Sequence, residues 1–291
     1  MSEKLLKLGI PAGSLQKATI DLFTKAGFNI ADSERSFLPR IDDEQIQPIC
    51  LRAQEMSKYV ADGVLDAGIT GYDWIMENES DVVEVAELAY SKATSKPARW
   101  VLAVPAESKI TKPADLQGRI VATELANVTR QYFADKNIDV KVEFSWGATE
   151  VKARLVDAIV ELTETGTSLL ANNLREIDTV MTSTTRLIAN KKAWEDKFKR
   201  EKIENITILL NAAIDARGKV GLKMNVKKSD LKSIFKILPA EKSPTISDLA
   251  DSDYVAIEVI IEGEVERAVM PALKRAGASG IITYPLNKVI H

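Results

Sequence analysis

The segment at residues 157–169 reads DAIVELTETGTSL, an apolar stretch with two acids followed by hydroxyl side chains around one glycine. The apolar stretch is typical of a strand, and the polar loop after it is typical of a turn from a strand into a helix. Side chains alternate between the two faces of a strand, so Asp157 and Glu161 share one face and can direct their carboxylates toward one ligand. The segment therefore predicts a strand–loop–helix unit of an α/β protein.

The loop of this segment has the composition of a phosphate-binding site. Gly166 lets the backbone approach an anion closely, and neighbouring N–H groups can converge on it. Thr163, Thr165, Thr167 and Ser168 add hydroxyl donors. Acids beside such a loop indicate a sugar phosphate, because carboxylates can hold ribose hydroxyls or a Mg²⁺ ion. The spacing fits equally well with a polar turn in which Thr165 or Ser168 caps the next helix.

Composition limits the classes of protein that this chain can be. Its 291 residues suffice for two or three domains, and 45% are hydrophobic and 28% charged. A formal net charge of −3 argues against non-specific nucleic-acid binding. Cys50 is the only cysteine, which excludes an intrachain disulfide and a cysteine-cluster metal site. Neither a cleavable leader nor a segment of membrane-spanning length is evident, so we expect a cytoplasmic protein without a membrane partner.

Histidine chemistry is also limited. The only histidine is the last residue, His291, where chains usually fray, and we assign it no catalytic role. This excludes Ser-His-Asp and Cys-His catalysis and histidine-based zinc sites. Any chemistry must rely on carboxylates, hydroxyls, Lys and Arg side chains, backbone amides or a metal held by oxygen ligands.

Strand and helix patterns alternate along the chain and predict a mainly parallel sheet, with a second series of strands beginning near Trp100. We expect strands at residues 178–183 and 186–189 to return to the first lobe, followed by a long helix at residues 191–210. After Arg217 the pattern changes to a β-α-β-β-α-β order, which is that of a small ferredoxin-like domain. Such an appended domain suggests regulation or assembly.

Two further loops are candidates for ligand binding. PAGSL at residues 11–15 joins the first strand to the first helix, where Gly13 and the free N–H groups of the helix start can meet an anion. DAGITG at residues 66–71 ends another strand, at the edge where open α/β sheets bind ligands. A helix cap by Ser14 and a tight turn are the respective alternatives. Arg52, after an apolar strand, can neutralise a phosphate or form a surface salt bridge.

EFSWGATE at residues 143–150 adds two acids beside an aromatic residue. Trp146 can stack on a base, although packing in the core is the commoner fate of a tryptophan. Glu150 is of interest because the strand with Asp157 follows shortly after it.

Together these segments closely resemble the ATP phosphoribosyltransferase family in its long form. The most specific matches are DAIVELTETGTSL (157–169), DAGITGYDW (66–74) and VEFSWGATEV (142–151), with RWVLAVP (99–105), KSPTIS (242–247) and GIITYPLNKVI (280–290) in support. The resemblance implies an α/β fold with two catalytic lobes like type II periplasmic binding proteins and a C-terminal ferredoxin-like, ACT-type regulatory domain. We place lobe I at residues 1–92 with 180–216, lobe II at 93–179 and the regulatory domain at 217–291.

The resemblance also implies an activity: Mg²⁺-dependent joining of ATP to phosphoribosyl pyrophosphate (PRPP), in which adenine N1 attacks ribose C1 and pyrophosphate leaves. The implied PRPP-binding residues are those of the loop, namely Thr163, Glu164, Thr165, Gly166, Thr167 and Ser168. Asp157 and Glu161 would hold the ribose hydroxyls, and Glu150 would lie near the reacting ends. The ATP side would contain Gly13, Arg52, Asp66 and Gly71.

The family resemblance further implies feedback inhibition by histidine and assembly as a homo-hexamer. Ser243 and Thr245 are the candidate histidine-binding residues, because a turn rich in hydroxyls can hold an α-amino acid; a proline-containing turn entering a strand is the alternative.

The sequence departs from the family in the first loop, where Ala12 replaces the usual lysine of a P-K-G pattern. Lys17 and Arg52 are the candidates to replace the lost cation. Two other functions remain open. One is a two-lobed protein that binds a small molecule without catalysis, because the same fold serves solute receptors. The other is an inactive regulatory paralogue, which Ala12 alone supports.

Overall fold

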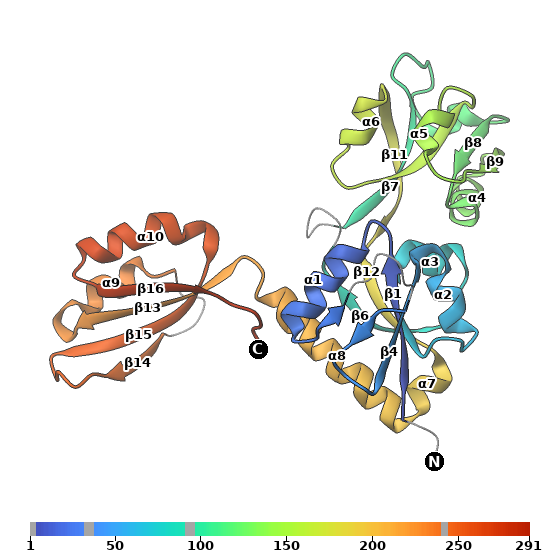
Figure 1. The fold of residues 1–291 in the computed structure, drawn as a ribbon. Coiled ribbons are helices and arrows are strands. Elements are labelled where there is room, and N and C mark those ends of the chain that lie inside the picture. The colour runs from blue at the N-terminus through green and yellow to red at the C-terminus, as the bar shows by residue number, and fades with distance from the viewer. Residues whose placement is uncertain (1–3, 32–37, 91–96, 240–243) are drawn as a thin grey trace. The chain divides into compact units, whose positions relative to one another are not determined.

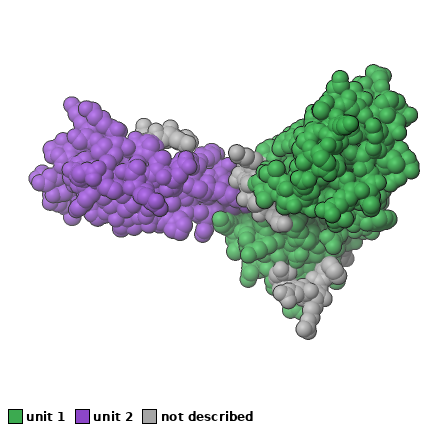
Figure 2. All heavy atoms as spheres, turned by 90° about the horizontal axis from the view of Figure 1, so that it is seen from above, with its two compact units in different colours: residues 1–210 green, residues 211–291 purple. Residues whose placement is uncertain are grey.

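The computed structural model describes residues 4–31, 38–90, 97–239 and 244–291. The chain forms two compact units, residues 1–210 and residues 211–291, which are coloured separately in Figure 2. The first unit contains two five-stranded sheets, and the second contains one four-stranded sheet. We call the parts of the first unit around these two sheets lobe I and lobe II (Figure 1).

The sheet of lobe I has the strand order β4-β1-β5-β12-β6. Its members are β1 (Leu6–Ala12), β4 (Ile46–Arg52), β5 (Ala67–Gly71), β6 (Val83–Leu88) and β12 (Thr185–Ala189). β1 runs parallel to β4 and β5, whereas β12 runs antiparallel to β5 and β6. The carboxyl ends of the three parallel strands therefore meet at one edge, which places the loops after Ala12, Arg52 and Gly71 together.

Three helices connect the strands of lobe I: α1 (Gln16–Ala26), α2 (Ala53–Ala61) and α3 (Tyr72–Glu77), with a small β2 (Ile30–Ala31) and β3 (Arg40–Ile41) ribbon beside them. The fit of α2 depends on two glycines in the sheet. A Cβ atom on Gly9 or Gly68 would lie 2.2 or 2.7 Å from the Met56 sulfur, so Met56 of α2 packs directly on the backbone of β1 and β5. This close packing fixes α2 and, with it, Arg52 at its start.

The sheet of lobe II has the strand order β11-β7-β10-β8-β9. Its members are β7 (Ala98–Pro105), β8 (Ile120–Thr123), β9 (Lys141–Phe144), β10 (Ala158–Thr163) and β11 (Leu174–Ser183), with η1 (Pro113–Leu116), α4 (Ala126–Asp135), α5 (Thr149–Lys152) and α6 (Thr167–Ala171) between them. β8, β9 and β10 are mutually parallel. Their carboxyl ends therefore share an edge that holds Glu124, Trp146 and the loop at residues 163–168.

One predicted strand lies in a different sheet from the one expected. Residues 178–183 belong to β11, which pairs with β7 along almost its whole length in the sheet of lobe II. The prediction that they return to lobe I is wrong; the return begins with β12. β11 is ten residues long, and the sequence has no breaker that marks where it leaves one sheet for the other.

The predicted long helix is two helices, α7 (Lys191–Glu195) and α8 (Lys197–Asp215). The Asn190 side chain caps α7 by accepting hydrogen bonds from the Lys192 and Ala193 amides. The boundary between the two compact units falls within α8.

The C-terminal unit contains β13 (Lys219–Lys227), η2 (Lys228–Asp230), α9 (Leu231–Ile237), β14 (Thr245–Asp248), β15 (Tyr254–Glu262), α10 (Gly263–Arg275) and β16 (Ser279–Pro285). This confirms the predicted β-α-β-β-α-β order. The sheet is antiparallel, in the order β14-β15-β13-β16. Alternate residues of β13 and β15, such as Leu222, Met224 and Ile257, form one core with Ile234 of α9 and Leu273 of α10.

The fold class expected from the sequence, α/β with two lobes and a C-terminal ferredoxin-like unit, is thus confirmed. Within the described residues, no helix combines the length and apolar character needed to cross a membrane.

Candidate active site

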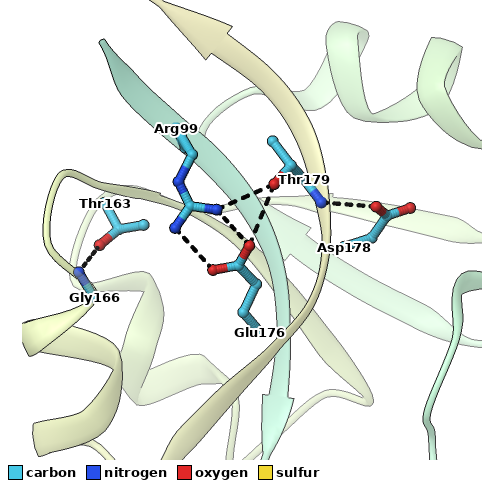
Figure 3. A network of polar contacts seen from close by, with 6 residues as sticks. All are labelled: Arg99, Thr163, Gly166, Glu176, Asp178 and Thr179. Atoms are coloured by element: carbon cyan, nitrogen blue, oxygen red, sulfur yellow. Dashed lines mark hydrogen bonds and ion pairs between the residues drawn. The ribbon is translucent and has the colours of Figure 1, made fainter. Parts of the chain in front are cut away.

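The loop at residues 163–168 turns the chain from β10 into α6. Gly166 has φ +77°, a backbone conformation that glycine adopts without strain, and no heavy atom lies within 4 Å of the position of an added Cβ. Its amide donates a hydrogen bond of 2.7 Å to the Thr163 hydroxyl (Figure 3). Thr163 therefore closes the turn, and space beside Gly166 stays open.

The other hydroxyls of the loop do not cap α6. The structure shows no side-chain cap for this helix; the Thr165 and Thr167 hydroxyls bond to each other at 2.9 Å. The Ser168 hydroxyl donates to the Glu150 carboxylate at 2.5 Å. The capped-turn interpretation is therefore not observed, and the hydroxyls gather on the exposed side of the loop.

Arg99 places a cation beside this loop. It is the β7 residue opposite Thr163 in the antiparallel ladder, so the two side chains project from the same face of the sheet. Its guanidinium forms a bidentate salt bridge with the Glu176 carboxylate, at 2.5 and 3.0 Å, and donates to the Thr179 hydroxyl at 3.2 Å (Figure 3). Glu176 and Thr179 of β11 thus hold the Arg99 guanidinium, and β11 belongs to the same sheet as β10, which leads into the loop.

Glu161 is the central acid of the site. Burial, followed by the negative charges of Glu150 and Glu124, raises its pKa from 4.5 to about 7, while hydrogen bonds from the Leu162 amide and the Thr149 hydroxyl oppose the rise. The Leu162 amide lies 3.0 Å from the carboxylate. Three carboxylates thus share the edge of lobe II next to the hydroxyl loop, and burial together with the like charges makes Glu161 titrate near pH 7.

Asp157 lies at the other end of the same strand. It precedes β10 and accepts hydrogen bonds from the Arg119 guanidinium at 2.8 Å and the Ile120 amide at 3.0 Å. The Ile120 amide, with Arg119, holds the pKa of Asp157 below its ordinary value. Four residues of strand separate it from Glu161 by roughly 13 Å. The structure therefore does not bring the two acids together: Asp157 fastens the amino end of β10 to β8.

Asp66, like Asp157, lies at the amino end of a strand. It precedes β5, is only 8% exposed, and accepts from the Lys7 amide at 2.8 Å and the Lys199 ammonium at 2.6 Å. It therefore lies at the amino end of the parallel strands, away from the edge that holds Arg52 and Gly71. Asp66 thus joins β1, β5 and α8, and the structure does not bring it together with Arg52 and Gly71.

Arg52 and Gly13 lie side by side on lobe I. Arg52 is paired with Ala12 in the β1–β4 ladder, and a Cβ on Gly13 would lie 3.3 Å from a guanidinium nitrogen of Arg52. Gly13 has φ +89°, and its amide donates to the Gln16 side chain at 3.3 Å. No side chain caps α1, so the expected alternative of a cap by Ser14 is not observed. A guanidinium thus lies next to Ala12.

A cleft of about 750 Å³ lies between the lobes. From lobe I it is lined by Arg52, Gln54, Glu55, Lys58, Trp74, Glu77, Asn78 and Glu79, and from lobe II by Glu124, Asn127, Phe144, Ser145, Trp146 and Gly147. The Gln54 amide reaches Glu124 across it at 3.5 Å. The cleft combines cations, carboxylates and aromatic rings, as a nucleotide site requires.

A second hollow of about 230 Å³ contains two more of the predicted residues, Gly71 and Glu164, together with Ser14. Gly71 has no room for a side chain, since a Cβ would lie 2.0 Å from the Asp73 carboxylate. The structure therefore brings Gly13, Arg52 and Gly71 to one edge of lobe I, and Glu150, Glu161 and the 163–168 loop to one edge of lobe II.

Two buried acids connect the lobes. The Glu77 carboxylate accepts hydrogen bonds from the Asn127 and Val128 amides at 2.9 and 3.0 Å, so an acid of α3 caps α4 of lobe II. Asp73 accepts from the Trp100 indole at 2.6 Å, and burial raises its pKa above the ordinary value. These contacts set the lobe arrangement around the cleft.

Thr245 lines a hollow of about 420 Å³ in the C-terminal unit, with Glu258, Tyr284 and other residues of the same unit. Tyr284 donates a short hydrogen bond to Glu258, which lowers the pKa of that acid. Ser243, the other predicted effector residue, lies outside the described residues. In the described part of the chain, no group of three or more His, Cys, Asp or Glu side chains is arranged to hold a metal ion.

The sequence analysis did not single out Arg99, Glu124 or Glu77, and for Trp146 it offered base stacking beside the commoner packing in the core. Arg99 and Glu124 could be inferred only from the ladder that pairs β7, β8 and β10, which is a long-range property. The expectation that Trp146 packs in the core is wrong, because this residue is 92% exposed. The glycine that follows it, Gly147, adopts a left-handed conformation at φ +99°. A glycine after Trp146 was therefore the sequence signal for a turn that leaves the tryptophan exposed.

Comparisons with known proteins agree over the whole chain. A model of the ATP phosphoribosyltransferase (HisG) family matches residues 52–212, and a model of the HisG C-terminal domain matches residues 216–288. An ATP phosphoribosyltransferase of Chlorobaculum parvum is 56% identical over 290 residues, 99% of each chain. One of Solibacter usitatus is 55% identical over 287 residues, 98% of this chain and 99% of the relative.

Among solved structures, a chain of the ATP phosphoribosyl transferase (HisG:HisZ) complex from Thermotoga maritima superposes with a TM-score of 0.62 at 28% identity. The match covers 72% of this chain and 98% of the other.

Proposed function

Because the chain belongs to the ATP phosphoribosyltransferase family in its long form, we propose that its cleft joins N1 of the ATP adenine to C1 of PRPP with release of pyrophosphate. Enzymes of this family are pentosyltransferases that catalyse the first step of histidine biosynthesis, and the C-terminal domain is the regulatory part of the long form. The observation that carries the residue assignments is the open hydroxyl loop directly beside the carboxylates of Glu161 and Glu150.

The loop binds the 5-phosphate of PRPP in this proposal. Thr165, Thr167 and Ser168 supply hydroxyl donors, and Gly166 lets the backbone approach the phosphate. Ser168 exchanges its bond to Glu150 for one to the phosphate. Arg99 adds a positive charge on the same sheet face, held in place by Glu176.

The carboxylates serve the reacting carbon. As the bond from C1 to pyrophosphate lengthens, positive charge develops on C1 and the ring oxygen, and a nearby carboxylate stabilises it. Glu161 holds the ribose hydroxyls and Glu150 lies beside it. Adenine N1 has its own lone pair, so the protein need not activate a nucleophile. The larger task is to position two polyanions, and closely facing lobes accomplish this.

The ATP side consists of Gly13, Arg52 and Gly71 on lobe I. We propose that Arg52 takes over the role of the family's lysine, because its guanidinium lies within 3.3 Å of the Cβ position of Gly13, next to Ala12. An arginine can bind two phosphate oxygens at once. Ala12 is also the one feature that favours an inactive regulatory paralogue.

Mg²⁺ completes the proposal. Mg²⁺ is usually bound through one or two carboxylates plus substrate phosphates, and the oxygen donors of Glu150 and Glu161 beside the loop fit that pattern. These two residues would hold the ion together with the pyrophosphate of PRPP. When bound, it neutralises charge on the departing pyrophosphate.

Histidine inhibition is assigned to the C-terminal unit. We propose that the hollow lined by Thr245, Glu258 and Tyr284 holds the effector, because a carboxylate and hydroxyls suit an α-amino group. Ser243 stays a candidate from the sequence. Assembly as a homo-hexamer and a cytoplasmic location are proposed from family membership alone.

The test is turnover. Purified protein mixed with ATP, PRPP and Mg²⁺ should form phosphoribosyl-ATP, followed by near-ultraviolet absorbance and identified by mass spectrometry. Omission of either substrate is the control. Intact binding of both substrates without product would favour the inactive paralogue, and no binding of either would reject the proposal.

A further inference from the structure

Trp146 is displayed in the cleft between the lobes. Its side chain is 92% exposed, the most exposed large apolar side chain within the described residues, and it lines the 750 Å³ cleft. The exposed Phe144 ring lines the same cleft, and exposed aromatic surface that gathers in a cleft with polar groups is typical of a ligand contact.

The backbone after Trp146 is built to hold the ring outward. Gly147 has φ +99° and Ala148 has φ +49°, so two consecutive residues adopt the left-handed conformation. For Ala148 this conformation costs on the order of 1 kcal/mol, a strain that the surrounding contacts must offset. A turn of this kind directs Trp146 away from lobe II rather than into its core.

Several contacts keep this turn in place. The Ser145 amide donates to the Thr123 carbonyl at 2.8 Å, and the buried Ser145 and Thr149 hydroxyls bond at 3.0 Å. The Lys152 ammonium donates to the Phe144 carbonyl at 3.0 Å. The Phe144 ring supports the indole edge-to-face, with centroids 4.9 Å apart. Trp146 is therefore held by its neighbours with most of its surface open.

The same contacts connect the ring to the reacting groups. Thr149 bonds to Ser145 and also to Glu161, the acid proposed to hold the ribose. Glu124, whose charge acts on Glu161, lies 3.7 Å from the Cβ position of Gly147. A flat group stacked on Trp146 would thus lie on the side of the cleft where C1 of PRPP must react.

We propose that Trp146 is the stacking platform for the adenine ring of ATP. The inference rests on the proposed function and adds a residue to its ATP side. Every base presents an aromatic face that stacks on an indole, and Arg52 and Lys58 on lobe I supply the cations that a triphosphate needs. A bound base would lie on lobe II near Glu161, with its phosphates toward lobe I.

Steady-state kinetics on three variants test this inference. Trp146→Ala should raise KM for ATP by about 5- to 150-fold, the range for loss of one base–aromatic stack, and change KM for PRPP by less than about 2-fold. Trp146→Phe, which keeps an aromatic face, should restore most of the loss. Leu155→Ala is the matched control, since Leu155 is another exposed apolar residue of lobe II (81%) outside the cleft. It should behave as the unmodified protein.

Equal KM for ATP in Trp146→Ala and the unmodified protein would overturn the inference while leaving the proposed function intact. If the unmodified protein forms no product, the proposed reaction fails, and the Kd of ATP from equilibrium dialysis on the same variants still decides the role of Trp146. A change in oligomer size by light scattering for Trp146→Ala, with the affinity for ATP unchanged, would assign the ring to a protein contact instead and also overturn it.

Discussion

Replacement of Glu161 by glutamine should make the protein more stable at alkaline pH. Burial and the charges of Glu150 and Glu124 raise the pKa of Glu161 from 4.5 to about 7. A folded-state pKa above the unfolded value means that the folded protein binds the proton more tightly, so this group costs stability as pH rises from 4.5 through 7. At 1.36 kcal/mol per pH unit, ionisation of Glu161 costs the folded state at most about 3 kcal/mol at pH 8.

Glu161→Gln keeps an oxygen that accepts from the Leu162 amide and removes the charge. The variant should match the original at pH 4.5 and exceed it at pH 8 by about 1–3 kcal/mol, since partial solvation of the carboxylate reduces the full value. Turnover should fall sharply, because the acid beside the reacting carbon is lost.

Urea denaturation followed by tryptophan emission suits this test. All four tryptophans, Trp74, Trp100, Trp146 and Trp194, belong to the first compact unit, so the signal reports that unit alone. Glu143→Gln is the matched control: Lys141 lowers the pKa of Glu143, so removal of its charge should not stabilise the protein. Equal stability of Glu161→Gln and the original at every pH would show that burial of this charge costs nothing and refute the reasoning.

Three other predictions follow from the placement of acids and of the effector hollow. Asp157→Ala should lower stability by about 1 kcal/mol in urea titrations and change KM for PRPP by less than about 2-fold, because Asp157 binds Arg119 and not the loop; a large rise in KM would restore it to the site. Glu77→Ala should lower the urea midpoint by the equivalent of about 1–2 kcal/mol through loss of the α4 cap, and an unchanged midpoint would contradict this role. Thr245→Ala should raise the histidine concentration for half-inhibition several-fold at unchanged KM values, whereas unchanged inhibition would place the effector elsewhere.

The fold could be predicted because its signals are local. Alternating strand and helix patterns and the β-α-β-β-α-β order after Arg217 each need only a few neighbouring residues. The error at residues 178–183 has the opposite cause. β11 and β12 are separated by a single residue, Thr184, and only their pairing with β7 and β5 shows that they belong to different sheets.

The two acids that the structure places away from the other candidate residues share one physical reason. Asp66 and Asp157 each precede a strand by one residue, whereas ligands meet the carboxyl ends of parallel strands. The sequence indicated the strands at 65–70 and around 157–162, but a boundary uncertain by one or two residues moves an acid from one edge of a sheet to the other. Glu161 lies in the carboxyl-terminal half of β10 and the 163–168 loop comes at its end, so a shift of one or two residues in the boundary leaves both near that edge.

The groups missed by sequence reasoning come from cross-strand pairing and from exposure. Arg99 is 64 residues before Thr163 in the chain and next to it in the ladder. Trp146 is of a residue type that usually packs in the core, and its exposure follows from the left-handed turn at Gly147 and Ala148.

The affinity of PRPP for a loop without one hydroxyl tests the account most directly. Thr167→Val keeps the shape of the side chain and removes an exposed hydroxyl that bonds to the Thr165 hydroxyl. Isothermal titration with PRPP and Mg²⁺ should show a Kd increase of about 10-fold or more, as expected for a lost hydrogen bond to a charged group. Thr24→Val on α1, which loses an exposed hydroxyl bonded to the Ile20 carbonyl, should leave the Kd unchanged. An unchanged Kd in Thr167→Val, with the fold intact by circular dichroism, would contradict the assignment of the 163–168 loop to the 5-phosphate.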